Sequence, residues 1–213
     1  MAIIEGKVGP QVLSDGSNAQ PRLAKDGSSV TSSIAGKHYE LASRSMIFVG
    51  GIAGTGVAPG TALATTAQAL LLYNPIGSGV NCSVIRFAHA HVSGTRGLGF
   101  WVVANYSTLQ PGTNVAPAGT ACVVHGANGD IGGNKALLYN AATCTAAPIF
   151  NEVLDWEGVL DGTGATQVGA SREYLFDGSC LVKPGTAKVF TYVGGAGTTP
   201  LVAVSAKWAE LAI

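Results

Sequence analysis

The chain has 213 residues, of which 47% are hydrophobic and only 11% charged, and its 12 basic and 12 acidic side chains give a net charge of zero. The high apolar content excludes an intrinsically disordered chain, and the lack of a basic surplus argues against a nucleic-acid-binding protein. The length suits one large domain, or one domain with an arm.

The uncharged composition is the first functional indication. Ordinary soluble proteins carry about 25% charged residues, and monomers normally keep a net charge of one sign for solubility. A neutral chain with 30 glycines favours a subunit whose surface is largely buried in an assembly. The alternative is a secreted or simply neutral domain.

Neither a membrane span nor a targeting segment is expected. Residues 46–85 carry no charge, but glycines and prolines interrupt this stretch. Its longest apolar run, Ala69–Tyr73, is far shorter than the roughly 20 residues of a spanning helix. The opening Met1–Glu5 lacks the basic start and long apolar run of a signal peptide. We therefore expect the protein to be made and kept in a cytoplasm.

Residues 1–40 are predicted to form an extended arm. They contain few large apolar residues, and turn-forming sequences occur at Asp15–Asn18 and Asp26–Ser29. Short strands are expected at Ile3–Val8 and Gln20–Ala24. Such an arm cannot bury itself, so it either stays mobile or docks on a neighbouring molecule. The contact residues predicted for the docked arm are Val8, Val12, Leu13, Arg22, Leu23 and Lys25.

From about Arg44 onward, short apolar runs bounded by glycine, proline and asparagine predict strands throughout, with no convincing helical period. The loop Ser93–Gly97 predicts a hairpin, and Asn128-Gly129 predicts a turn. The expected strands are Met46–Val49, Ala67–Tyr73, Ser83–Val92, Gly99–Tyr106, Ala121–His125, Lys135–Tyr139, Ile149–Val159, Leu175–Phe176, Cys180–Val182, Ala187–Val193 and Leu201–Glu210.

Alternation of apolar and polar residues is clearest near the end of the chain. The residues expected to share a face are Phe150, Leu154 and Trp156, opposite Asn151, Asp155 and Glu157, and in the last strand Val202, Val204, Ala206 and Trp208. About nine or ten short strands predict an all-β fold. We expect a jelly-roll-like β-sandwich over residues 41–213, preceded by the arm, with a closed barrel as the structural alternative.

Four cysteines, Cys82, Cys122, Cys144 and Cys180, are widely spaced and form no close pair. Zinc sites use close pairs, so a metal site is not predicted. Reduced, buried thiols are the favoured interpretation.

His89 and His91 are the most suggestive metal-ligating residues. On a strand, residues i and i+2 project to the same face, where two imidazoles can share a metal with a carboxylate. Ile85 and Phe87 are expected on that face as well. This apolar company favours packed or interface histidines over metal ligands.

The other chemistry-bearing motifs fit turns or solvated faces better than active sites. Ser78 lacks the Gly-x-Ser-x-Gly setting of a nucleophile, and Asp130 lacks the ligand spacing of a calcium loop. Paired carboxylates would need an apolar pocket to raise one pKa, and none is predicted around the acidic cluster of Glu152, Asp155, Glu157 and Asp161. The sequence therefore predicts no enzyme and no cofactor.

Several passages resemble virion structural proteins of tailed bacteriophages. The likeness runs from about residue 36 to residue 210 and is carried mostly by turn residues. The passages are Gly36–Glu40, Arg44–Val49, Gly56–Thr61, Leu72–Gly79, Val92–Thr95, Asp177–Ser179, Pro184–Thr186 and Trp208–Glu210.

The resemblance implies a head decoration (cement) protein or another virion surface component, placed on the capsid and assembled in the host cytoplasm. The expected partners are the major capsid protein and further copies of the chain, in a homotrimer or otherwise a dimer, with neither nucleic acid nor a membrane. One alternative is a glycan-binding tail or spike accessory domain, which exposed aromatic residues such as Trp101 or Tyr106 would favour. The other is an enzyme of unknown type. A major shell subunit is disfavoured because no helical spine is predicted.

Overall fold

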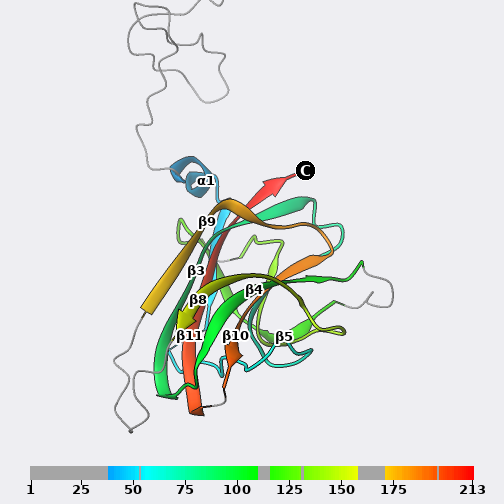
Figure 1. Cartoon of the computed structure of the whole chain (residues 1–213). Helices are drawn as coiled ribbons and strands as arrows, with labels where there is room; N and C mark the ends of the chain where they lie inside the picture. Colours follow the sequence, from blue (N-terminus) through cyan, green and yellow to red (C-terminus); the bar gives the residue numbers. More distant parts are fainter. Residues whose placement is uncertain (1–37, 53, 110–115, 131, 158–170, 196) are drawn as a thin grey trace, which may run out of the picture. The chain divides into compact units, whose positions relative to one another are not determined.

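The computed structural model describes residues 38–52, 54–109, 116–130, 132–157, 171–195 and 197–213, which are the coloured parts of the ribbon in Figure 1. Within it, Leu41–Ile213 form one compact unit. The predicted arm lies outside the described residues apart from its last three positions. Its two expected strands and its six expected contact residues lie outside them too, so they stay predictions.

The described strands form two antiparallel sheets, and a helix, α1, spans Tyr39–Ser43. The first sheet has the order β6-β1-β11-β3-β9, with the bounds β1 Ile47–Gly51, β3 Val80–Thr95, β6 Val123–Gly126, β9 Ser171–Val182 and β11 Thr198–Ala212. The second has the order β5-β7-β2-β10-β4-β8, with the bounds β2 Gln68–Asn74, β4 Gly99–Ser107, β5 Ala118–Ala121, β7 Leu137–Thr143, β8 Ile149–Glu157 and β10 Thr186–Gly194.

Eight of these strands have the connectivity of a jelly roll. The chain alternates between the sheets from β1 to β4 and again from β8 to β11. The groups β1-β11-β3-β9 and β2-β10-β4-β8 therefore interlock as two Greek keys. The two layers can be followed in Figure 1, where β4 and β8 lie in front of β3 and β11. The predicted jelly-roll-like sandwich is confirmed, and the closed barrel is wrong.

The strands β5, β6 and β7 belong to the connection between β4 and β8. β6 pairs with β1 and extends the first sheet, whereas β7 pairs with β2 and carries β5, which extends the second. The chain changes sheet at Cys122, whose backbone N–H donates to the Leu138 carbonyl at 2.8 Å. This insertion closes one side of the sandwich, while β8 and β9 border the other.

One predicted hairpin is wrong. β3 and β4 are joined through residues 96–98, as the loop motif suggests, but they lie in different sheets. The turn predicted at Asn128-Gly129 is confirmed, because Gly129 has a φ of 97° and the Gly126 N–H donates to the Asp130 carbonyl at 2.7 Å. A turn motif specifies local backbone geometry and leaves open which strand becomes the hydrogen-bonded neighbour.

The sequence patterns also miss α1 and β5, and they divide β9 in two. α1 has five residues, too few to show a helical period. β5 consists of alanine, glycine and threonine, so it shows no apolar alternation. In β9, Asp177 and Gly178 have φ angles of 43° and 89°. They form a bulge inside one strand, where a turn between two strands was expected.

An aromatic cluster joins the two sheets at the centre of the sandwich. Phe87 of β3 stacks on Phe190 of β10, with ring centroids 4.7 Å apart, and the Trp101 ring of β4 lies 5.5 Å from that of Phe87. All three side chains are fully buried. The inward face predicted for β11 is confirmed as part of this core and comprises Val202, Val204, Ala206 and Trp208.

A bulge in β3 reverses which of its residues face the core. Cys82 and Val84 are buried before the bulge, and Phe87 and His89 after it. Between them, Ile85 has no partner residue on β11 or on β9. One extra residue reverses the alternation of a strand. The expectation that Ile85 shares a face with Phe87 and the histidines is therefore wrong.

A second apolar cluster lies on the outer face of the second sheet, and the chain covers it with its own loops. Leu71 and Tyr73 of β2 belong to it, whereas Leu70 and Leu72 point into the main core. The connections before β2 and after β7 lie over this cluster, where the Cys144 N–H donates to a carbonyl of the earlier connection at 2.6 Å. Most of this face is thus already buried within one copy.

A buried carboxylate fastens the insertion to the sandwich. Glu210 of β11 is 5% exposed. Its oxygens accept hydrogen bonds from the backbone N–H groups of Lys135 and Ala136, at 2.8 and 2.9 Å, and from the Trp208 indole at 3.1 Å. Lys135 and Ala136 lead into β7, so this carboxylate anchors the start of that strand. Hydrogen bonds to a charged acceptor are among the stronger ones in proteins.

We expect Glu210→Gln to lower the free energy of unfolding by about 1–3 kcal/mol, because the amide can accept fewer of the three hydrogen bonds and leaves a buried donor unpaired. Urea unfolding followed by tryptophan fluorescence measures the change. Lys183→Gln, at an exposed position between β9 and β10, is the control and should change stability by less than about 0.5 kcal/mol. Equal effects of the two substitutions would contradict the anchoring role.

Candidate interaction surface

The two histidines of the predicted pair lie in different environments. His89 is 2% exposed and lies within an aromatic stack, 4.6 Å from the Trp101 ring centroid and 6.3 Å from that of Tyr174. Burial, and then the Arg96 and Arg172 guanidinium groups, lower the pKa of His89 to about 3. The described residues contain no group of three or more histidine, cysteine or acidic side chains placed to hold a metal ion. His89 is a neutral core residue.

His91, two residues further on, has a separate role. Its Nε2 lies 2.9 Å from the Gly94 carbonyl, near the end of β3. The side chain therefore binds the backbone of its own strand. The favoured interpretation of packed histidines holds for His89, and His91 stabilises the local backbone.

Two members of the predicted acidic cluster, Glu152 and Asp155, have described side chains. Asp155 was expected on a solvent-exposed face, yet its side chain is only 12% exposed and its Oδ1 lies 2.9 Å from Nη1 of Arg172 on β9. Glu152 is exposed and has no ion-pair partner within the described part of the chain. The side chain of Glu157 and the whole of Asp161 lie outside the described residues.

Ser78 and Asp130 occupy turns, as expected. The Ser78 N–H donates to the Pro75 carbonyl at 3.2 Å, and its hydroxyl lies 3.3 Å from the Val80 carbonyl. Asp130 accepts hydrogen bonds from Asn128 and Ser45, at 2.6 and 3.2 Å. These contacts fasten the β6–β7 turn to the segment before β1. Both side chains therefore have structural partners.

The aromatic residues that would have favoured a glycan groove are buried. Trp101 is fully buried, and Tyr106 is 3% exposed. Trp101 belongs to the inter-sheet cluster, and Tyr106 belongs to the outer cluster, where its hydroxyl lies 2.7 Å from that of Thr145. The condition that would have favoured the glycan-binding alternative is therefore not met at these two positions, because both faces of β4 are covered.

All four cysteines carry free thiols, as predicted, and all but the half-buried Cys122 are buried. Burial raises the pKa of Cys82 and Cys180 to about 12 and that of Cys144 to about 11. Burial also raises the pKa of Cys122, although a hydrogen bond from Asn140 opposes the change. Thiols of this kind are poor nucleophiles, because the thiolate is the reactive form.

A hollow of about 360 Å³ beside His89 offers no obvious ligand chemistry. Ala88, Ala90 and Ala203 provide small side chains on its wall. The charged residues that line it are engaged within the chain: Arg172 with Asp155, and Glu173 with Arg86 at 3.2 Å. Ser171 and Ser205 also line the hollow.

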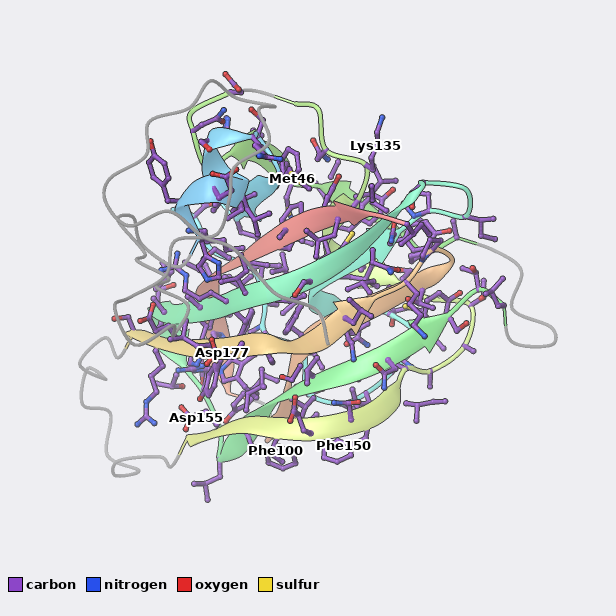
Figure 2. All side chains as sticks on the ribbon, turned by 90° about the horizontal axis from the view of Figure 1, so that it is seen from above. Met46, Phe100, Lys135, Phe150, Asp155 and Asp177 are labelled. Atoms are coloured by element: carbon purple, nitrogen blue, oxygen red, sulfur yellow. The ribbon has the colours of Figure 1, made fainter. Side chains whose placement is uncertain are left out.

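The β8–β9 side of the sandwich exposes large apolar side chains from both sheets. On β8, Phe150 is 51% exposed and Val153 is 52% exposed, and on β9 Leu175 is 66% exposed. β8 and β9 are the last strands of their sheets. Figure 2 shows Phe100 and Phe150 along this border of the molecule. We name the β8–β9 edge by its exposed apolar residues, which are Ile149, Phe150, Val153, Leu175 and Leu181.

Bulges on β8 explain why its predicted faces are wrong. Neither Asn151 nor Leu154 has a partner residue on β4. Phe150 was expected on the same face as Leu154, but Leu154 packs against the main core, whereas Phe150 lies opposite Ala104 of the outer cluster. Val153 is turned outward as well, opposite Val102. The bulges thus place two large apolar residues, Phe150 and Val153, where solvent reaches them.

The opposite side of the sandwich exposes a smaller apolar set on the insertion. Val123 of β6 is 66% exposed and Leu137 of β7 is 40% exposed. Lys135 lies two residues before Leu137 in the chain, and Figure 2 shows it on the border opposite Phe150. All four residues of β5 are exposed and small. We name this side the insertion edge, defined by Val123, Lys135, Leu137 and the strand β5.

Comparison with protein families, with curated proteins and with solved structures finds no match for this chain. Within the described residues, none of the helical structure is long and apolar enough to cross a membrane. The exposed apolar residues of the two edges and the neutral composition are therefore the features that bear on function.

We expect stability to fall as the pH drops from about 6.5 toward 3. The pKa of folded His89 is depressed, so the unfolded chain binds a proton in this window that the folded chain does not. Urea unfolding between about pH 4 and pH 7 should therefore show a smaller pH slope for His89→Phe, by up to about 1.4 kcal/mol per pH unit. An equal loss of slope in His125→Gln, at an exposed position, would contradict this assignment.

Native protein at about pH 8 should react slowly with a thiol reagent, because pKa values of about 11–12 leave roughly one thiol in a thousand or fewer ionised. Cys122 should react first, and all four thiols should react at once after unfolding in guanidinium chloride. Absorbance of the released chromophore follows both phases. Rapid labelling of all four thiols in the native protein would contradict the burial described here, and Cys122→Ser identifies the earliest site.

Proposed function

We propose that this chain is a non-enzymatic structural protein of a bacteriophage virion, and specifically a capsid decoration protein that bridges and stabilises major capsid subunits. The observation that carries the proposal is the exposure of large apolar residues along both borders of a neutral sandwich. An exposed apolar edge strand promotes association with other protein molecules, and monomeric proteins usually protect such edges with charged side chains. In a subunit of a shell, the same edges are buried against neighbours.

The chemistry of the charged residues supports the same proposal. Arg172 pairs with Asp155 across β8 and β9, and Arg86 pairs with Glu173 across β3 and β9. Buried Glu210 binds backbone groups. These five charged side chains therefore hold strands of the sandwich together, which is a structural role.

A decoration protein gains strength from repetition. Each apolar contact contributes about 25 cal/mol per Å² that it removes from water. The same contact recurs at every equivalent position of a shell, so individually modest interfaces act together. A rigid jelly roll, a fold also found among viral capsid and lectin domains, can present such contacts in a fixed geometry.

A glycan-binding accessory domain is the competing proposal, because jelly rolls also occur in lectins. Exposure of Trp101 or Tyr106 would favour it, but both rings are buried. The observations therefore favour contacts between protein surfaces. A glycan array with the purified protein separates the two proposals, since a decoration protein needs no sugar ligand.

We expect the full chain to sediment as a homotrimer, or otherwise a dimer, and to bind purified heads of the phage that encodes it. Deletion of residues 1–40 should abolish head binding and leave the sandwich folded, because Leu41–Ile213 form a compact unit. Sedimentation velocity and co-sedimentation with heads measure the two properties, and circular dichroism checks the fold of the shortened chain. A strictly monomeric protein that does not bind the phage heads would overturn the proposal.

A further inference from the structure

We infer that copies of this chain associate side by side in a closed ring, with the β8–β9 edge of one copy against the insertion edge of the next. The inference rests on the proposed function and adds to it which two surfaces meet. It also fixes the class of contact, because two different surfaces meet at every interface.

The two edges lie on opposite sides of the sandwich. The first sheet runs from β6 to β9 and the second from β5 to β8, so the edges bound opposite sides of the same sandwich. Figure 2 shows this separation directly, with Lys135 on one border and Phe150 on the other. Unlike surfaces on opposite sides of a subunit join head to tail, and such contacts form a ring when the rotation between copies closes.

The two edges hold exposed side chains of opposite charge. The β8–β9 edge holds the exposed carboxylate of Glu152, and the insertion edge holds the exposed ammonium of Lys135. Neither has an ion-pair partner within the described residues. Two β8–β9 edges facing each other would bring two copies of Glu152 together, and like charges at a strand pairing are destabilising. Contact between unlike edges instead places an acidic group beside a basic one.

The end strands of the second sheet are also suited to contact between unlike edges. The second sheet ends at β8 on one side and at β5 on the other, and neither strand has an outer neighbour among the described strands. The exposed residues of β5 are alanine, glycine and threonine, which allow another strand to approach closely. Contact between the two edges would therefore continue the second sheet from copy to copy, with Phe150 and Val153 buried against the neighbour.

The test compares three substitutions to aspartate at exposed apolar positions. Val153→Asp alters the β8–β9 edge, Val123→Asp alters the insertion edge, and Leu98→Asp is the control, on the β3–β4 connection and 57% exposed. Sedimentation velocity over a range of concentrations should show a ring for the wild type and the control. Each edge variant should dissociate at concentrations about tenfold higher or more, because it would bury an unpaired charge.

A mixture of the two edge variants distinguishes the class of contact. Each retains one intact edge, so an equimolar mixture should form a dimer and nothing larger. If Val153→Asp dissociates the assembly while Val123→Asp leaves it whole, the contact joins like edges and the inference is wrong. If both variants assemble as the wild type does, another surface holds the copies together, and the inference is again wrong.

Exchange of the two charges gives an independent readout. Glu152→Lys and Lys135→Glu should each weaken the ring, and the double variant should restore it. Failure of the double variant to recover would remove the argument from charge and overturn the assigned pairing. Binding to phage heads is measured on the same samples. Wild-type protein that binds heads as a monomer would overturn the ring and leave the proposed decoration function standing.

Discussion

The stacking of Phe87 on Phe190 is the contact on which the rest of the sandwich depends. One ring belongs to each sheet, and the pair sets the two layers at a fixed separation around the buried Trp101. Phe87 reaches this position only because the bulge at Ile85 reverses the alternation of β3. If β3 alternated regularly through Ile85, its second half would turn Phe87 and His89 toward solvent. The bulge is therefore a requirement of the core.

The same bulge places His89 within the aromatic core. A histidine placed between Trp101 and Tyr174 is held by ring contacts, and burial, followed by two nearby guanidinium groups, lowers its pKa. The environment that makes it a good core residue also removes it from the pH range in which histidines catalyse. The thiols follow a similar pattern, because burial raises their pKa values out of the nucleophilic range. His89 and the buried thiols therefore act as core residues in the described part of the chain.

The fold could be predicted from the sequence wherever apolar residues form a continuous run or alternate regularly with polar ones. The uninterrupted apolar run of β2 and the regular alternation of β11 predict buried strands, and both are found. Irregular strands defeat the same reasoning, because a bulge such as that at Leu154 of β8 changes the outward residues without changing composition. The loop between β3 and β4 likewise gives no information on which sheet receives the next strand. The exposure of Phe150, on which the candidate surface depends, could therefore not be predicted from the sequence.

The position of the insertion between β4 and β8 has a consequence for how such a protein changes over evolutionary time. The eight strands of the jelly roll keep their connectivity whatever the length of this one connection, and Glu210 fastens the insertion from the core side. One border of the molecule is thus encoded by a single contiguous stretch of gene. Replacing that stretch would change the neighbours that the sandwich accepts and would conserve the framework that presents them.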